Sequence, residues 1–277
     1  MQTLLRSIWT RLAPDFEAEQ ARATGRFGAH EAGVLIVACV ALTMMQFGGA
    51  EQVFLSLFGE ALTPPELAAD PYLPPLMAAR AHPWYELAGL THWVAFCVIG
   101  YVLVPALYLR ARGHRVRDVY LGFTGFREHL GVYLGLYAAV MVPVVLISFT
   151  PEYQQIYPFY SHAGRSGFDL LAWELAYGLQ FFALEFFFRG FLLEGLRRWL
   201  GYGAVFVMLV PYCMLHFQKT WTESIGAIVA GVILGTLAMR YRSIWGGVLV
   251  HWLVAISMDL LSLVHRGALP TRWWPGG

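Results

Sequence analysis

The run Ala183-Leu-Glu-Phe-Phe-Phe-Arg-Gly190 places a carboxylate and a guanidinium four residues apart inside an apolar stretch long enough to cross a bilayer. Side chains at positions i and i+4 of an α-helix lie on the same face, so Glu185 can reach Arg189. On insertion scales each charge costs about 2.5–3.5 kcal/mol in hydrocarbon, and charges kept there usually have a function. Later apolar segments contain two histidines, His216 and His251. These four residues are the candidate site.

The composition is that of a polytopic membrane protein. Of 277 residues, 58% are hydrophobic and only 13% are charged, whereas about 25% of the residues of an ordinary soluble domain carry charge. The formal net charge of +1 gives no reason to expect a nucleic-acid partner. The three cysteines have neither CxxC nor metal-ligand spacing. We therefore expect the lipid bilayer to be the protein's surroundings.

Seven stretches approach or exceed the roughly 20 apolar residues that a helix needs to cross the hydrocarbon core. We therefore predict an all-α transmembrane bundle of about seven spans. The N-terminal segment 1–31 has no apolar h-region, so the first apolar segment is expected to stay in the mature protein. The predicted spans lie near 32–49, 86–109, 130–149, 168–193, 202–217, 224–240 and 244–264.

The predicted organisation follows the order of these spans. Residues 32–165 hold the N-terminal helices and a long outer loop at 50–85, residues 166–265 form the bundle with the candidate site, and 266–277 is a tail. If segment 1–31 is cytoplasmic, thirteen Lys and Arg residues of the loops fall on the inner side and five on the outer side. Loops rich in Lys and Arg stay in the cytoplasm. This predicts a cytoplasmic N-terminus and a multi-pass protein of the plasma membrane, in a bacterium the inner membrane.

Two segments predict local structure. The start of the outer loop, Gln52-Val-Phe-Leu-Ser-Leu-Phe58, can form a short amphipathic helix along the membrane interface. In the sixth span, Ala227, Gly231 and Gly235 form a stripe of small residues that lets a neighbouring helix approach closely. Glycine is also simply common in membrane helices, and this explanation of the stripe has equal weight.

Each candidate residue also has a plain structural explanation. Glu185 and Arg189 could be a buried ion pair that only locks the fourth span to its neighbours. His216 lies in the outer part of the fifth span and could meet water at a helix end. His251 lies seven residues into the last span, where water is not expected unless a cavity reaches it. Taken together with Glu185, the two histidines favour one polar cluster on three helices over three coincidences.

Two further acids are accessory candidates. Asp259 comes eight residues after His251, about 12 Å along the helix axis, so the two cannot touch. We expect Asp259 to pair with another helix or to line the rim of the same cavity. Glu223 follows Thr220 with the spacing of a capping box at the start of the sixth span. It is kept as a reserve acid because it lies only seven residues after His216.

Missing motifs exclude several mechanisms. The chain has no HExxH, GxSxG, Walker or dinucleotide-binding motif. Zinc held by Glu185, His216 and His251 has suitable ligand types, but their spacing matches no zinc motif. No cofactor is therefore expected, and a zinc site ranks second. Arg189 lies towards the inner end of its span, so to meet His216 the fifth helix must be tilted, displaced or broken, and Pro211 is where we expect a break.

In type, order and spacing these residues resemble the CPBP family of intramembrane endopeptidases, named for CAAX proteases and bacteriocin processing and also called ABI. The chain has the second half of that family's EExxxR motif with its following glycine, a tyrosine version of its FxxxH motif, and its last histidine. The resemblance covers about residues 170–262. The matching residues are Glu185, Arg189, Gly190, Tyr212, His216 and His251.

Two positions depart from that pattern, so the chain resembles a divergent member. Leu184 stands where the family has its first glutamate, which is taken as the general base, and Ala255 stands where it has an asparagine. The resemblance then implies that Glu185 takes over as base, that Glu223 or Asp259 contributes, or that hydrolysis is lost. A branch that serves a sorting system, such as the myxosortase-like members that process C-terminal anchors, is compatible with these changes.

We therefore predict an intramembrane endopeptidase that cleaves membrane-anchored proteins or lipidated peptides. Glu185, oriented by Arg189 and assisted by His216, would draw a proton from water. His251 would donate a hydrogen bond to the oxyanion that forms on the scissile carbonyl. The alternatives are a non-catalytic membrane scaffold or bacteriocin self-immunity protein, and a proton-coupled transporter, whose repeated halves the sequence does not show.

Overall fold

The computed structural model describes residues 16–68, 70 and 72–276. Within these residues every regular element is a helix, and an isolated bridge between Leu121 and Ser243 is the nearest approach to a strand. The prediction of an all-α helix bundle is confirmed. About half of the predicted cytoplasmic segment 1–31, with two of its four arginines, lies outside the described residues.

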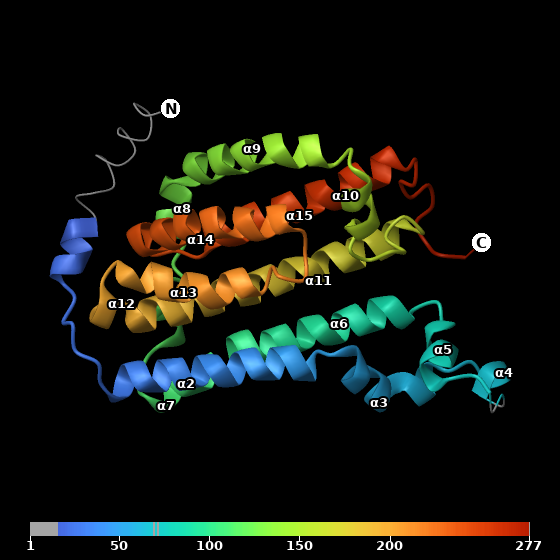
Figure 1. Cartoon of the computed structure of the whole chain (residues 1–277), viewed down its shortest axis with the longest axis horizontal. Coiled ribbons are helices and arrows are strands. Elements are labelled where there is room, and N and C mark those ends of the chain that lie inside the picture. Colours follow the sequence, from blue (N-terminus) through green and yellow to red (C-terminus); the bar gives the residue numbers. More distant parts are fainter. Residues whose placement is uncertain (1–15, 69, 71, 277) are drawn as a thin grey trace. The chain divides into compact units, whose positions relative to one another are not determined.

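Long apolar helices alternate with short connecting helices (Figure 1). The described α-helices are α2 (Ala29–Thr43), α3 (Glu51–Leu62), α4 (Pro65–Ala68), α5 (Pro75–Arg80), α6 (Tyr85–Val98), α7 (Val104–Ala111), α8 (Thr124–Glu128), α9 (Leu130–Ile147), α10 (Pro151–Ile156), α11 (Gly167–Glu185), α12 (Glu194–Leu200), α13 (Gly203–Met214), α14 (Trp221–Tyr241) and α15 (Trp245–His265). The π-helices are η1 (Met44–Gly48), η2 (Ile99–Leu103) and η4 (Phe186–Leu193), and η3 (Val116–Asp118) is a 3₁₀ turn.

Six helical runs in the described part of the chain are long and apolar enough to cross a membrane, so the protein is a multi-pass membrane protein. The predicted span at 202–217 is the exception, because its helix α13 has only 12 residues. Such a helix is about 18 Å long, short of the roughly 30 Å hydrocarbon core. The six runs are Ala29–Gly48, Tyr85–Ala111, Leu130–Ile147, Gly167–Leu200, Trp221–Tyr241 and Trp245–His265.

The ends of α13 explain why the fifth span is shorter than predicted. Before it, the chain turns at Gly201, whose φ of +55° is a conformation that favours glycine. The predicted break at Pro211 does not occur, because α13 continues through it to Met214. Proline cannot donate a backbone hydrogen bond, but the Pro211 carbonyl still accepts one from the Leu215 N–H at 3.3 Å. The helix therefore ends after Met214 and not at the proline.

The chain forms two compact units, each built from three segments of the sequence. Unit 1 consists of residues 1–40, 104–130 and 184–247. Unit 2 consists of residues 41–103, 131–183 and 248–277.

In unit 1, α13 packs against α14 through the stripe of small residues (Figure 1). A Cβ added at Gly231 would lie 2.4 Å from the Leu209 side chain and 3.1 Å from Tyr212. One at Gly235 would lie 3.0 Å from Met208. The stripe thus has the packing function that the sequence predicts, and η4 packs against α12, α13 and α14.

In unit 2, the predicted helix at 52–58 is part of α3, which packs against α5 and α6. Glu51 at its start accepts three hydrogen bonds from the Arg80 guanidinium, at 2.8, 3.0 and 3.3 Å. The start of α11 is fixed by Asp169, which accepts hydrogen bonds from Arg165 at 2.6 Å and from Tyr160 at 2.8 Å. The hydrogen bond to Asp169 raises the pKa of Arg165.

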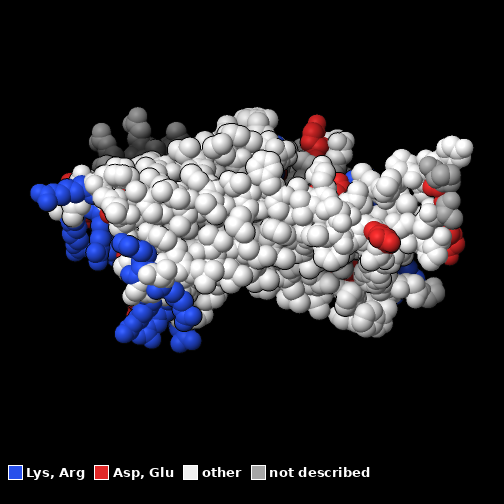
Figure 2. All heavy atoms as spheres, turned by 90° about the horizontal axis from the view of Figure 1, so that it is seen from below, with Lys and Arg blue, Asp and Glu red and all other residues white. Residues whose placement is uncertain are grey.

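Charge is distributed unequally between the two units. Unit 1 contains fifteen Lys and Arg residues and nine Asp and Glu residues, whereas unit 2 contains four and nine. All thirteen basic residues that the sequence predicts on the inner side belong to unit 1. Figure 2 shows Lys and Arg side chains crowded together on the face that it draws. The arginine-rich loops that connect the spans therefore all belong to unit 1.

Candidate active site

Glu185 and Arg189 form the ion pair that their spacing predicts. The distance from Arg189 Nη1 to Glu185 Oε1 is 3.1 Å, and the two side chains are 0% and 1% exposed, respectively. They lie where α11 passes into η4. A buried charge is stable only when it is compensated, and here each of the two opposite charges compensates the other. The pair thus places two charged groups side by side in apolar surroundings.

Arg189 lies in an eight-residue π-helix, η4, all of whose residues are buried. In a π-helix each N–H bonds five residues back, and such segments often occur at functional sites, mostly as single turns. The sequence does not reveal this widening, because the run of phenylalanines around Arg189 fits an ordinary apolar helix equally well. The helix is therefore irregular at the candidate site.

Tyr212 connects the ion pair with His216 inside unit 1. The Arg189 guanidinium carbon lies 4.1 Å from the centre of the Tyr212 ring, a cation–π contact. The centres of the Tyr212 and His216 rings are 5.0 Å apart, and His216 Nδ1 lies 3.0 Å from the Tyr212 carbonyl oxygen. The short α13 thus brings His216 towards Arg189. Tyr212 was not among the predicted site residues, although its place in the FxxxH-like motif was a signal.

A second residue that the sequence did not single out is Gly247, near the start of α15. A Cβ added there would lie 2.2 Å from Glu185 Oε2 and 2.5 Å from its carboxyl carbon. The carboxylate therefore rests directly on the α15 backbone, where no larger residue fits. On α15, His251 comes one turn after Gly247 and on the same face.

His251 belongs to unit 2, where its ring is partly buried. It stacks on the Phe181 ring with the centres 5.4 Å apart and the planes at 5°. Phe181 stands one turn before Glu185 on α11. Three of the four predicted residues are thus connected in unit 1, and the fourth is held by an aromatic stack in unit 2.

Asp259 pairs with a residue of another helix, which was one of the two expectations for it. It is fully buried, and its Oδ2 accepts a hydrogen bond from Trp173 Nε1 at 2.8 Å. Its carboxyl also interacts electrostatically with that of Glu174. Glu174 is a buried acid on α11 that sequence reasoning missed, because its partner stands 85 residues later. All of these residues belong to unit 2.

Glu223 caps α14 as its spacing predicts. The Thr220 hydroxyl accepts a hydrogen bond from the Glu223 N–H at 3.3 Å, and Lys219 Nζ lies 3.5 Å from the Glu223 carboxylate. The next residue, Ser224, donates a hydrogen bond to the His216 carbonyl at 2.9 Å. The start of α14 therefore fixes the turn that carries His216.

The two positions that depart from the family pattern lie in apolar surroundings. Leu184 is 6% exposed. Ala255 is 5% exposed and belongs to a hydrophobic cluster with Trp173 and Tyr177. Both positions thus hold apolar side chains packed among other apolar groups.

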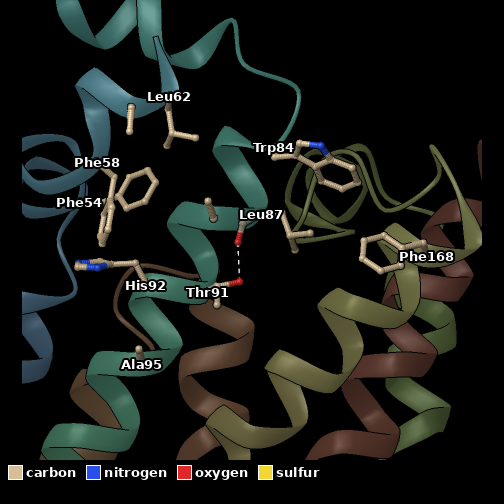
Figure 3. A pocket seen from close by; sticks show the side chains of 11 residues that line it. Phe54, Phe58, Leu62, Trp84, Leu87, Thr91, His92, Ala95 and Phe168 are labelled. Atoms are coloured by element: carbon tan, nitrogen blue, oxygen red, sulfur yellow. Dashed lines mark hydrogen bonds between the residues drawn. The ribbon is translucent and has the colours of Figure 1, made fainter. Parts of the chain in front are cut away.

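Unit 2 contains an apolar cavity of about 660 Å³. Figure 3 shows Phe54 and Phe58 on one side, Trp84 and Phe168 on another, and His92 near the base. The imidazole Nε2 of His92 lies 2.8 Å from the carbonyl oxygen of Gly48. None of the four candidate residues lines this cavity, and His92 is the one lining residue with an ionisable side chain.

Within the described ranges no three His, Cys, Asp or Glu side chains gather as a metal ion would require. The ligand set that the sequence offers for zinc, Glu185, His216 and His251, takes residues from both units. Of the three, Glu185 is already paired with Arg189, at 3.1 Å.

Comparison with protein families gives a match in the second half of the chain. The family model described as Type II CAAX prenyl endopeptidase Rce1-like matches residues 167–257. No curated protein and no solved structure gives a significant match to the chain. The matched segment runs from the start of α11 into α15 and contains all four candidate residues.

Proposed function

Residues 167–257 are Rce1-like, and we propose that the protein is an intramembrane endopeptidase that cleaves membrane-anchored proteins or lipidated peptides. At the level of the family, the match supports a CAAX-protease-like activity. The observation that carries the proposal for this chain is the buried Glu185–Arg189 ion pair in a π-helical segment. It provides a charged base in a place from which bulk water is excluded.

In the proposed mechanism Glu185 is the general base. Its carboxylate takes a proton from a water molecule, and the hydroxide formed attacks the carbonyl carbon of the scissile peptide bond. His251 donates a hydrogen bond to the oxyanion of the tetrahedral intermediate. Glu185 then returns the proton to the leaving amine as the carbon–nitrogen bond breaks. Arg189 stays positively charged and is a positioning residue for Glu185.

His216 assists at the more accessible end of the site. Its ring is partly buried and contacts Tyr212, whose other contact is the guanidinium of Arg189. An imidazole can take up or release protons near neutral pH. His216 therefore suits the exchange of protons between the site and water.

The proposal is tested with the full-length protein in detergent and in lipid nanodiscs. The substrates are a farnesylated CAAX peptide, the same peptide without the lipid, and a peptide with a C-terminal transmembrane anchor. Cleavage by the wild type that Glu185→Gln abolishes and Glu174→Gln retains supports the mechanism. Equal cleavage by the wild type and Glu185→Gln would show that another residue is the base.

The same assay distinguishes a glutamate-activated water from a metal-bound one. Cleavage that persists after treatment with a chelator supports the mechanism with Glu185 as base. Cleavage that is lost with chelator and restored by zinc supports a site made by Glu185, His216 and His251. The carboxylate and two imidazoles have the donor types that zinc takes in hydrolases.

A non-catalytic scaffold or self-immunity protein is the second candidate, and Leu184 and Ala255 favour it. Both are buried among apolar side chains, where the family pattern has a glutamate and an asparagine. This candidate predicts that Glu185→Gln preserves the cellular phenotype, while substitution of Arg189 only lowers stability.

For the orientation, we propose that segment 1–31 is cytoplasmic and that unit 1 carries the cytoplasmic loops. All thirteen basic residues of the predicted inner side lie in unit 1, and such residues are retained in the cytoplasm. Reporter fusions after residues 120 and 201 should report the cytoplasm. A fusion after residue 70 should report the opposite side.

A further inference from the structure

Unit 1 contains a cavity of about 250 Å³ between the start of α2, the segment after α7, and the end of α12. Four side chains that are cationic or can become so line it, and we call it the basic pocket. The four are His30, His114, Arg115 and Arg198. The His30 and His114 rings meet edge to face, with their centres 5.6 Å apart.

The floor of the basic pocket is apolar and well packed. Leu109, Val119 and Phe191 line it and are at most 6% exposed. Gly195 brings the α12 backbone against α2, because a Cβ there would lie 2.9 Å from Val34. The pocket is therefore preformed, with fixed walls and basic groups at its rim.

The basic pocket lies where three apolar runs reach the same side of the membrane. The first run begins at Ala29, the second ends at Ala111 and the fourth ends at Leu200. The four basic residues of the rim each lie within four positions of one of these ends along the sequence. In a bilayer this is the depth of the lipid headgroups.

The acids near the rim leave the two arginines available. Glu194 is held by Arg197 at 2.8 Å and by Arg242 at 3.3 Å. Asp118 lies at the exposed rim, 4.0 Å from Arg117. Arg115 and Arg198 form no ion pair with any described residue.

The remaining charged neighbours of His30 add more positive than negative charge. They are Glu31, His114, Arg112 and Arg198. The Glu31 carboxylate already accepts a hydrogen bond from the Gly28 N–H at 2.9 Å. The positive charge of the arginines around the pocket is therefore not fully neutralised by nearby acids, and their N–H donors face the cavity.

We propose that the basic pocket binds the phosphate of an anionic phospholipid headgroup. Arginine side chains on two sides offer the forked donors that suit phosphate oxygens, and the imidazole N–H groups add further donors. Free phosphate has the same chemistry, but the apolar floor and the three span ends favour a lipid whose acyl chains continue into the bilayer. Basic pockets between transmembrane helices bind anionic headgroups in this way.

The test measures which lipids stay bound to the protein. Full-length wild type is taken from nanodiscs of mixed phosphatidylglycerol and phosphatidylcholine into detergent, and the retained lipids are counted by native mass spectrometry. We compare the double variant Arg115→Gln/Arg198→Gln with Arg26→Gln/Arg127→Gln, which removes the same charge from unit 1 outside the pocket. The pocket variant should retain phosphatidylglycerol about tenfold less well, and the control within about twofold of the wild type.

Three outcomes overturn the proposal. Equal losses in both double variants would indicate diffuse surface charge, and equal retention of both lipids by the wild type would indicate no headgroup site. Inorganic phosphate that stabilises lipid-free wild type as much as phosphatidylglycerol does would identify a free-phosphate site. If the double variant does not elute as a folded protein, the exposed single variant Arg198→Gln is measured in its place. The readout is lipid binding, so it does not depend on any protease activity.

Discussion

Glu174 and Glu185 are two buried glutamates eleven residues apart on α11, and their partners are opposite in kind. They are 7% and 1% exposed. Glu185 pairs with a cation, Arg189, on the next turn of the same helical run. Glu174 faces another acid, Asp259, which comes from α15. The same residue type on the same helix thus has a cationic partner, Arg189, at one position and an acidic partner, Asp259, at the other.

The difference fits the proposed division between a base, Glu185, and a structural contact, Glu174. Two carboxylates that lie near each other in an apolar interior each disfavour the charged form of the other. No N–H or O–H group of the described residues donates a hydrogen bond to the Glu174 carboxyl. Glu185 instead has a compensating cation, because Arg189 Nη1 lies 3.1 Å from its carboxylate. The proposed mechanism therefore assigns proton transfer to Glu185, whereas Glu174 faces Asp259 on α15.

The largest expected effect separates the two glutamates by function. Glu185→Gln should lower the rate of substrate cleavage by about 10²–10⁴-fold, because it removes the general base. Glu174→Gln should leave the rate close to that of the wild type, since the new amide can donate a hydrogen bond to Asp259. Initial rates on the same anchored substrate measure both. A loss of cleavage in Glu174→Gln with none in Glu185→Gln would reverse the assignment.

A smaller effect on the rate is expected when the Glu185 carboxylate is displaced without being removed. Gly247→Ala puts a methyl group where the carboxylate lies, 2.2 Å from its Oε2. A misplacement of that size can cost about 10²-fold in rate. The control is Gly226→Ala on α14, where an added Cβ meets nothing within 4 Å. Wild-type cleavage by Gly247→Ala would show that the α15 backbone does not position the base.

The same two glutamates show what the sequence could predict. The Glu185–Arg189 pair was predictable because both partners lie on one helix with i, i+4 spacing, which is a local property. The Glu174–Asp259 contact was not, because it depends on how α11 packs against α15. The sequence indicated that Asp259 would need a partner on another helix, but it contained no signal for which one.

Helix geometry was the other part that the sequence left open. The apolar stretch 202–217 is long enough for a span, but the chain turns at Gly201 and leaves the helix after Met214. That shorter α13 is what brings Tyr212 and His216 towards Arg189. The sequence contained no signal for the π-helix η4. The hydrogen-bond register of a helix is set by packing on all sides and not by residue type.

The contact between Glu174 and Asp259 is expected to affect stability more than rate. Asp259→Ala removes the acceptor of the Trp173 Nε1 hydrogen bond, which is fully buried. A buried donor left without a partner costs about 1–3 kcal/mol. Asp259→Asn keeps an acceptor oxygen and should lose less. Denaturant unfolding in detergent compares the two, and equal stability would show that the Trp173 hydrogen bond contributes little.

The smallest effect is expected at Glu223, the accessory acid that the structure uses as a cap. Glu223→Gln keeps the backbone N–H that binds Thr220 and loses only the ion pair with Lys219, which contributes about 0–1 kcal/mol. Thr220→Ala removes the cap itself and should cost more, about 0.5–2 kcal/mol. If both variants cleave like the wild type, Glu223 has no part in catalysis. If Glu223→Gln loses cleavage while the less stable Thr220→Ala keeps it, Glu223 acts on the substrate or on water, and Glu185 does not work as the only acid of the site.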